Sequence, residues 1–94
     1  MWLAHQGHEV GGLALDPLPG ALFERADVGG SLAFDQRADI RDRTAVLEAV
    51  NAFAPDVLVH MAAQSLVRPS YSEPRLTVET NVLGTLSVLE ALSR

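Results

Sequence analysis

The sequence predicts an α/β fold in which a partial parallel sheet is flanked by helices. Two short segments, 8–15 and 31–38, carry strand-like apolar positions, and Val57–Val59 is a continuous apolar run suited to a buried strand. Helical patterns alternate with these segments at 43–54 and from Glu73 onwards. Because strands that alternate with helices are typical of parallel sheets, we expect one half of a Rossmann-like fold.

Breaking residues set the limits of the expected elements near the N-terminus. Gly7 ends a helix expected over 1–6, because glycine is the usual residue just after a helix. A loop follows the first strand, and a short helical turn is expected over 21–26. Gly29–Gly30 interrupts that turn before the second strand begins.

The two longer helices have clearer signals. Asp42 is the expected N-cap of the helix 43–54, because its carboxylate can accept hydrogen bonds from free N–H groups there. Gly84 is unfavourable inside the last helix by about 1 kcal/mol relative to Ala, and a close approach of a neighbouring strand or ligand would explain it. The apolar stripe of the last helix is formed by four residues, Val78, Val82, Leu86 and Leu89.

Composition and charge exclude several classes of function. The chain has 94 residues, a net charge of −5 and no basic run, which argues against nucleic acid or an anionic membrane as a partner. It has no cysteine, and its three histidines have no metal-binding arrangement, so no metal site is expected. No apolar stretch is long enough to span a bilayer, and a cytoplasmic location is expected. All seven basic residues are Arg, so a mechanism that needs Lys is closed to this chain alone.

A longer motif comes after the apolar run at Val57–Val59. Segment 60–71 reads HMAAQSLVRPSY, and the helix after it contains TNVLGTLSVLEALSR. Together with GHEVGGLALDP at 7–17, these motifs resemble the extended short-chain dehydrogenase/reductase family, and within it the CDP-glucose 4,6-dehydratases. The resemblance covers nearly the whole chain. It implies a Rossmann-like domain that binds NAD, a nucleotide-sugar substrate and a homodimer in the parent enzyme.

Asp16 is a candidate cofactor residue at the end of a strand. In a dinucleotide-binding fold, an acidic residue there accepts hydrogen bonds from the adenosine ribose hydroxyls and favours NAD over NADP. The alternative is a turn-forming Asp before Pro17.

Five further residues are expected to bind NAD through the resemblance. It places Asp39 and Ile40 against the adenine ring, with Asp39 accepting from the adenine amino group; the alternatives are an exposed loop acid or a helix-capping cluster with Asp42. It also places the backbone of Ala62, Ala63 and Gln64 along the cofactor near the nicotinamide ribose. Tight packing of small residues under a helix would explain the same segment.

Four residues near the last helix complete the candidate site. Arg68, Ser70 and Tyr71 are expected to contact substrate or pyrophosphate, because a guanidinium suits bidentate phosphate contact; the alternative is a surface loop. Tyr71 is not the catalytic tyrosine of the family, because the lysine expected four residues later is Arg75 here. The resemblance gives Asn81 a supporting role in the active site, and simple hydrogen bonding between helix and strand is the alternative.

Parts of the family's site are missing from the sequence. It has no Gly-rich turn of the kind that seats a pyrophosphate, and none of the family's proton-transfer residues, so no catalytic residue is expected. We expect residues 1–94 to be a single partial NAD-binding Rossmann domain, truncated at both ends and lacking the first strand. In the parent, NAD would take a hydride from C4 of CDP-glucose, water would leave across C5 and C6, and the hydride would return to C6. The chain alone is expected to be inactive and unstable.

The sequence is also compatible with two other functions. The chain is a piece of a related NAD-dependent nucleotide-sugar epimerase, or it is a non-catalytic α/β module that binds a nucleotide or a partner chain. The sequence does not separate the first of these from the dehydratase, since the substrate domain expected to distinguish them is absent from these 94 residues. Folding with adenine-nucleotide affinity would favour the second.

Overall fold

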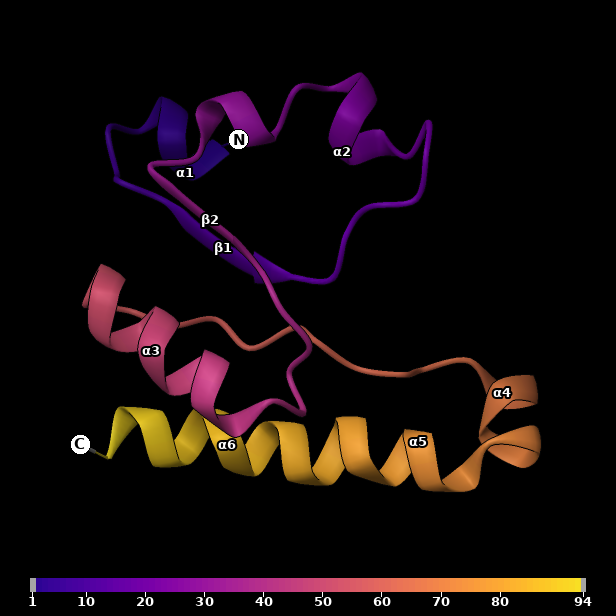
Figure 1. Ribbon diagram of the computed structural model, residues 1–94. Coiled ribbons are helices and arrows are strands. Elements are labelled where there is room, and N and C mark those ends of the chain that lie inside the picture. Colours follow the sequence, from indigo (N-terminus) through magenta and orange to yellow (C-terminus); the bar gives the residue numbers. More distant parts are fainter. Residues whose placement is uncertain (1, 94) are drawn as a thin grey trace. The chain divides into compact units, whose positions relative to one another are not determined.

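A computed structural model describes residues 2–93 and divides into two compact units, Met1–Ala38 and Asp39–Arg94 (Figure 1). The first unit contains two helices, one 3-10 turn and two strands. In chain order these are α1 (Trp2–His5), β1 (Gly11–Ala14), α2 (Leu22–Arg25), η1 (Gly29–Ser31) and β2 (Phe34–Arg37). Gly7 has φ of 89° after α1, which is the left-handed conformation expected of a glycine that ends a helix.

Strands β1 and β2 form a parallel pair, as the sequence predicts. Gly11 lies opposite Phe34, and Ala14 lies opposite Arg37. The crossover that parallel strands require is made by α2 and η1. Arg37 fastens the end of the pair, because its Nη1 donates to the carbonyl of Leu15 at 3.1 Å. Its guanidinium also lies 4.6 Å from the centre of the Phe23 ring, a favourable cation–π contact.

The second unit is built on helices. They are α3 (Arg43–Phe53), α4 (Val67–Ser72), α5 (Pro74–Val78), the π-helical turn η2 (Glu79–Leu83) and α6 (Gly84–Leu92). The last three follow one another without a break and form one long helix (Figure 1). The expected N-cap is confirmed, since the Ala45 N–H donates to Asp42 Oδ1 at 3.0 Å. Helix α3 ends at Ala54, which has φ of 49°, just before Pro55.

The core lies between α3 and α6. The buried apolar side chains in the described part of the chain all come from these two helices: Val46, Ala49, Val88 and Ala91. Ser87 is also buried, and its hydroxyl donates to the Leu83 carbonyl at 3.0 Å, so it carries no unpaired polar group. An ion pair between Arg43 and Glu90 joins the two helices at their exposed edge. A core of this size is small, as expected for a short chain.

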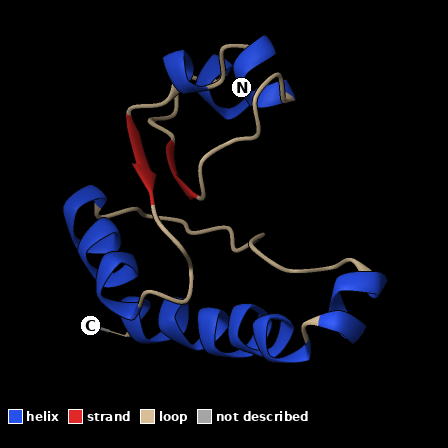
Figure 2. Cartoon of the chain, turned by 45° about the vertical axis from the view of Figure 1, so that its right-hand side comes forward, coloured by secondary structure: helices blue, strands red, loops and turns tan. Residues whose placement is uncertain are grey.

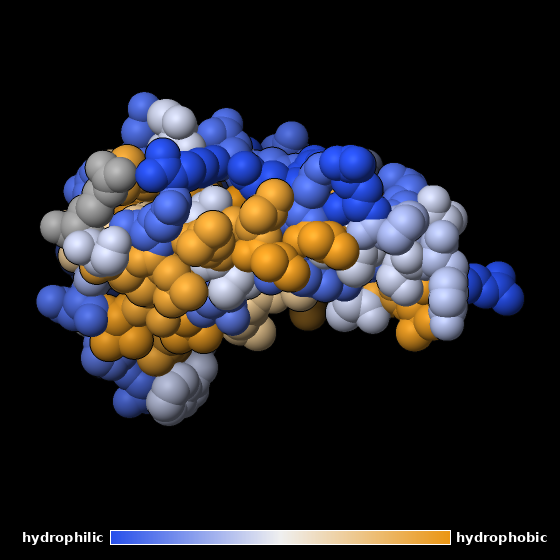
Figure 3. Space-filling model, turned by 90° about the horizontal axis from the view of Figure 1, so that it is seen from below, coloured by the Kyte–Doolittle hydropathy of each residue, from blue (hydrophilic) through white to orange (hydrophobic). Residues whose placement is uncertain are grey.

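The long helix packs through a face other than its apolar stripe. The four residues of the expected stripe, Val78, Val82, Leu86 and Leu89, are 48–59% exposed. Apolar side chains gather on the face of the molecule shown in Figure 3. The face toward α3 instead carries the small residues Gly84, Ser87 and Ala91 beside Val88. Small side chains allow two helices to approach closely, so size rather than hydropathy selects the packed face.

The run Val57–Val59 is not a strand, which corrects the sequence prediction. The chain between α3 and α4 is drawn as a loop along its whole length in Figure 2. Val57 and Val59 are 78% and 70% exposed, whereas a buried strand was expected. An extended segment becomes a strand only where a second strand supplies ladder hydrogen bonds. Within residues 2–93 the sheet consists of β1 and β2 alone, so no strand pairs with this segment.

The connection that carries Arg68, Ser70 and Tyr71 is helical, where a loop was the alternative. It forms α4, with Pro69 in its first turn. Proline is tolerated there because the N–H that it lacks would have no partner inside the helix. The position of Pro69 is therefore compatible with a helix, although the sequence analysis predicts none there.

Gly84 is required by a close approach within the second unit. A Cβ built on Gly84 would lie 2.7 Å from Cγ2 and 3.4 Å from Cβ of Ile40, the residue that follows Asp39. No real Cβ contact is that short, and the Ile40 methyl is branched directly from Cβ, so it cannot swing away freely. A close approach at Gly84 is thus confirmed, but the neighbour is a loop side chain and not the strand or ligand expected from the sequence.

Gly84→Ala is expected to destabilise the chain, although alanine is the better helix former by about 1 kcal/mol. The added methyl group must displace Ile40, and overpacking of this kind costs about 1–3 kcal/mol. Urea unfolding of the wild type, Gly84→Ala, Ile40→Ala and the double variant measures the coupling between the two positions. We expect Gly84→Ala to be less harmful, or stabilising, once Ile40 is Ala; equal effects in both backgrounds would contradict the contact.

Candidate functional site

One amide side chain holds the extended segment before α4. The backbone N–H of Gln64 donates to Asn81 Oδ1 at 2.7 Å, and Asn81 Nδ2 donates to the Gln64 carbonyl at 2.9 Å. Asn81 thus satisfies both backbone groups of one residue, as a neighbouring strand would in a sheet. It lies in the π-helical turn η2, a distortion that often occurs at functional positions in helices.

The side chain of Gln64 completes this attachment. Its Nε2 donates to Thr77 Oγ1 at 2.9 Å and to the Leu66 carbonyl at 3.2 Å, while its Oε1 accepts from the Leu66 N–H at 2.8 Å. Every donor of Gln64 is therefore used inside the chain. Its role in the structure is to fix the segment against α5 and η2.

A second contact holds the segment four residues upstream. His60 Nε2 lies 2.9 Å from Thr85 Oγ1, and the Thr85 hydroxyl donates to the Asn81 carbonyl at 2.7 Å. Because that hydroxyl has only one hydrogen, Thr85 must accept from His60, and the Nε2 of His60 must carry a proton. His60 is exposed and acts here as an anchoring donor.

Ala62 and Ala63 are exposed between these two attachment points. In residues 2–93, none of their backbone N–H and C=O groups takes part in a hydrogen bond. These groups are open to a ligand, and the methyl side chains leave room for it. The segment therefore has open backbone groups and small side chains between its two attachment points.

The loop Asp39–Asp42 is the second fixed feature of this unit. The Arg41 N–H donates to Asp39 Oδ1 at 2.9 Å, which forms an Asx-turn, and the Asp42 N–H donates to the Asp39 carbonyl at 2.9 Å. Ile40 packs on Gly84 from the same loop. The loop is therefore joined to α3 through the Asp42 cap and to α6 through Ile40.

Arg41 binds the Asp39 carboxylate with its side chain as well. Its Nε lies 3.0 Å from both carboxylate oxygens, and its Nη2 lies 2.6 Å from Oδ2. Its Nη1 reaches Glu79 Oε2 at 3.4 Å, so the guanidinium bridges the loop to η2. The side-chain hydrogen bonds from Arg41, and then its backbone N–H, hold the pKa of Asp39 below its ordinary value. A carboxyl with a lowered pKa adds stability above its ordinary pKa, and that stability is lost as the pH falls through the folded value.

Asp16 lies in the first unit, two residues after β1. Its side chain is exposed, and its carboxylate has no hydrogen-bond or ion-pair partner among residues 2–93. The position at the end of a parallel strand agrees with the sequence prediction. Asp16 and the Gln64–Asn81 pair belong to different units, so each is described by itself.

The candidate substrate residues lie on α4. Tyr71 is 84% exposed and Arg68 is also exposed, and neither side chain has a hydrogen-bond or ion-pair partner in the described part of the chain. The Ser70 hydroxyl donates to the Val67 carbonyl, so Ser70 is used within its own helix. Arg68 and Tyr71 are therefore open to a ligand, and Ser70 has only lone pairs to offer.

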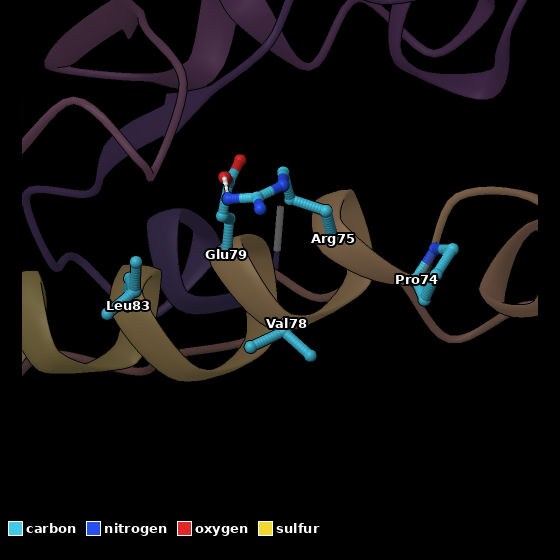
Figure 4. A pocket seen from close by; sticks show the side chains of 5 residues that line it. All are labelled: Pro74, Arg75, Val78, Glu79 and Leu83. Atoms are coloured by element: carbon cyan, nitrogen blue, oxygen red, sulfur yellow. Dashed lines mark ion pairs between the residues drawn. The ribbon is translucent and has the colours of Figure 1, made fainter.

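A shallow hollow lies beside α5 and η2. It is lined by Pro74, Arg75, Val78, Glu79 and Leu83, and Figure 4 shows the Arg75 and Glu79 side chains turned toward each other. These two form an ion pair of 3.8 Å, with Arg75 89% exposed. None of the residues expected from the sequence to bind a ligand lines it, although Glu79 also pairs with Arg41.

Residues 2–93 carry no features of a metal site or a membrane span. No group of three or more metal-ligating side chains occurs there that could hold a metal ion. None of the helices in that range has the length and apolar character to cross a bilayer.

The sequence analysis did not predict three residues that contribute to the site, Thr77, Thr85 and Arg41. Thr77, Asn81 and Thr85 are spaced by four residues, so they lie on one helix face, and all three bind the extended segment. That polar spacing inside an apolar helix was a readable signal, of which only Asn81 was noticed. Arg41 was also missed, although an Asp two residues before it is typical of an Asx-turn.

Comparison with known proteins gives consistent results for sequence and structure. A sequence profile described as GDP-mannose 4,6 dehydratase matches residues 22–94. The chain is 40% identical over 95 aligned residues to CDP-glucose 4,6-dehydratase from Salmonella typhimurium, and 33% identical over 72 residues to dTDP-glucose 4,6-dehydratase from the same organism. These alignments cover 100% and 76% of this chain, but 26% and 20% of the relatives.

Among solved structures, the chain is similar to UDP-glucose 4-epimerase from Thermus thermophilus, which was crystallised as a complex with NAD. The TM-score is 0.75 at 38% sequence identity, over 95% of this chain and 27% of that one. The similarity to a Rossmann-fold protein agrees with the parallel pair and its flanking helices. The chain thus spans about a quarter of the length of the relatives that it matches over most of its own length.

Asn81→Ala is expected to lower the free energy of unfolding by about 1–3 kcal/mol, because it leaves the Gln64 N–H and C=O without their partner. Asn81→Asp keeps an acceptor for the N–H but places a carboxylate oxygen against the carbonyl, so we expect a similar loss above the pKa of the new carboxyl. Urea unfolding measures both. Asn51→Ala, on the exposed face of α3, is the control and should change stability by less than about 0.5 kcal/mol. Equal effects at positions 51 and 81 would contradict the attachment.

Proposed function

Because the chain belongs to the GDP-mannose 4,6 dehydratase family, we propose that it supplies part of the NAD site of a nucleotide-sugar 4,6-dehydratase. The observation that carries the proposal is the segment 60–64. Its ends are fixed by Thr85 and Asn81, while the backbone groups of Ala62 and Ala63 are exposed and unpaired in the described chain. A preorganised backbone with open donors and acceptors suits a bound dinucleotide.

The proposal extends to the adenine half of NAD, with each residue taken within its own unit. The Asp39 side chain is 31% exposed and ionised, so it would accept from the adenine amino group beside Ile40. The free carboxylate of Asp16 would accept from the ribose hydroxyls and repel the additional phosphate of NADP. Gln64 and Asn81 would hold the nicotinamide end of the segment in place.

The proposed substrate is CDP-glucose, supported by the extent of the match to the Salmonella CDP-glucose enzyme. NAD would supply the redox chemistry, taking a hydride from C4 of the sugar and returning it to C6 after water is lost across C5 and C6. Arg68 would bind the nucleotide phosphates, and Tyr71, with the Ser70 lone pairs, would contact the substrate from α4. A cytoplasmic location and a homodimer of the parent enzyme belong to the same proposal.

A nucleotide-sugar epimerase is the second candidate. The structural similarity to the Thermus epimerase favours it, with a TM-score of 0.75. The two reactions share the hydride transfer at C4 and differ in the later steps. They are therefore separated by the product formed from CDP-glucose or UDP-glucose, and not by NAD binding.

Calorimetric titration of the chain with NAD and NADP tests the cofactor proposal. We expect NAD to bind more tightly, and Asp16→Ala to reduce the NAD-to-NADP affinity ratio by about tenfold, because a carboxylate facing a phosphate is removed. Glu9→Ala, an exposed acid of the same unit, is the control and should leave the ratio unchanged. An unchanged ratio in Asp16→Ala would remove Asp16 from the site. If neither dinucleotide binds, the chain does not form an NAD site.

A further inference from the structure

The stretch Val57–Met61, in the loop between α3 and α4, has a backbone that is free along its whole length. No N–H or C=O group of its main chain takes part in a hydrogen bond within residues 2–93. The side chains of Val57, Val59 and Met61 are also largely exposed, and the stretch is drawn as loop in Figure 2. Another molecule can therefore reach both its main chain and its side chains.

This stretch meets the main requirement of an endopeptidase substrate. An extended peptide binds a protein by adding a strand to it, which uses main-chain hydrogen bonds together with pockets for alternate side chains. A segment whose backbone groups are already unpaired can bind in this way without first breaking bonds of its own, and such segments are preferred sites of proteolytic nicking. Segments in helices must unfold locally before they can do so.

The other loops in the described part of the chain do not meet this requirement. In the loop after β1, Pro17 and Pro19 have no N–H to donate, and the Ala21 N–H donates to the Leu18 carbonyl at 3.0 Å. The turn before α3 is closed by the bond from the Asp42 N–H to the Asp39 carbonyl. Among the loops in residues 2–93, Val57–Met61 is thus the longest stretch with a free backbone.

We propose that the peptide bond between Val59 and His60 is a cleavage site for an endopeptidase that binds extended chains and has a small apolar specificity pocket. Val59 lies at the centre of the stretch, and its side chain is 70% exposed, so it can enter such a pocket. The stretch contains neither Lys nor Arg, which a trypsin-like pocket would need.

Hydrolysis of this bond breaks the link between the carbonyl carbon of Val59 and the nitrogen of His60. Water supplies the oxygen of the new Val59 carboxylate, and the nitrogen becomes the new amino terminus. Helices α3 and α6, which form the core, lie on opposite sides of the bond along the chain. The cut therefore separates their packing into two chains, and this inference does not depend on NAD binding.

Limited digestion of the chain with elastase, which has a small specificity pocket, tests the proposal. Val78 and Val82 are matched controls within the same molecule, since they are 55% and 58% exposed but lie in the long helix. Mass spectrometry of early time points gives the rate of cleavage after each valine, relative to the rate in the chain unfolded by urea. We expect folding to slow cleavage after Val59 at least about tenfold less than after Val78 or Val82.

Two variants test the assignment of the bond. Val59→Asp places a charge where the pocket needs an apolar side chain, so the first cut should be lost. Val78→Asp makes the same exchange in the helix and should leave the first cut unchanged. Equal slowing at the three valines, a first cut at any other bond, or a cut after position 59 that persists in Val59→Asp would each overturn the proposal.

Discussion

The organisation of the second unit depends on one interaction, the double hydrogen bond between the Asn81 amide and the backbone of Gln64. The chain between α3 and α4 has no ladder partner among the described residues, so the part-buried backbone groups of Gln64 need another partner. One helical side chain does this, and two threonines, four residues before and after it, extend the attachment. The exposed backbone of Ala62 and Ala63 is held between these points and is available to a ligand.

The same helix also fixes the loop Asp39–Asp42, through different chemistry. Gly84 admits Ile40 because it has no side chain, and Glu79 pairs with Arg41. The helix that carries Asn81 thus holds two chain segments, one by amide hydrogen bonds and the other by shape and charge. Surface ion pairs contribute little to stability by themselves, so the value of Arg41 lies in the orientation that it gives to Asp39.

Much of the fold could be predicted from the sequence, and the errors have physical causes. The Asp42 cap was predictable because it depends on a few neighbouring residues, and the parallel pair because strands and helices alternate along the chain. A close approach at Gly84 could be expected from glycine alone, but its neighbour Ile40, far away in the sequence, could not. The run Val57–Val59 was expected to be a strand, but strand formation needs a partner that hydropathy alone does not supply. The packed face of α6 was misjudged for a related reason, since close approach to α3 depends on small residues such as Ser87. In the site, Asn81 was found through its motif, whereas Arg41 was missed because its role appears only when the loop is folded.

The most direct test of this account is amide hydrogen exchange of the 94-residue chain, read at single residues by NMR. The account predicts that the Gln64 amide exchanges slowly, at a rate comparable to the amides of α6, because Asn81 accepts its hydrogen bond. The amides of Ala62 and Ala63 should exchange rapidly, since neither has a partner in the described chain. Rapid exchange at Gln64, or alternating protection along 57–63 as in a β-strand, would contradict it.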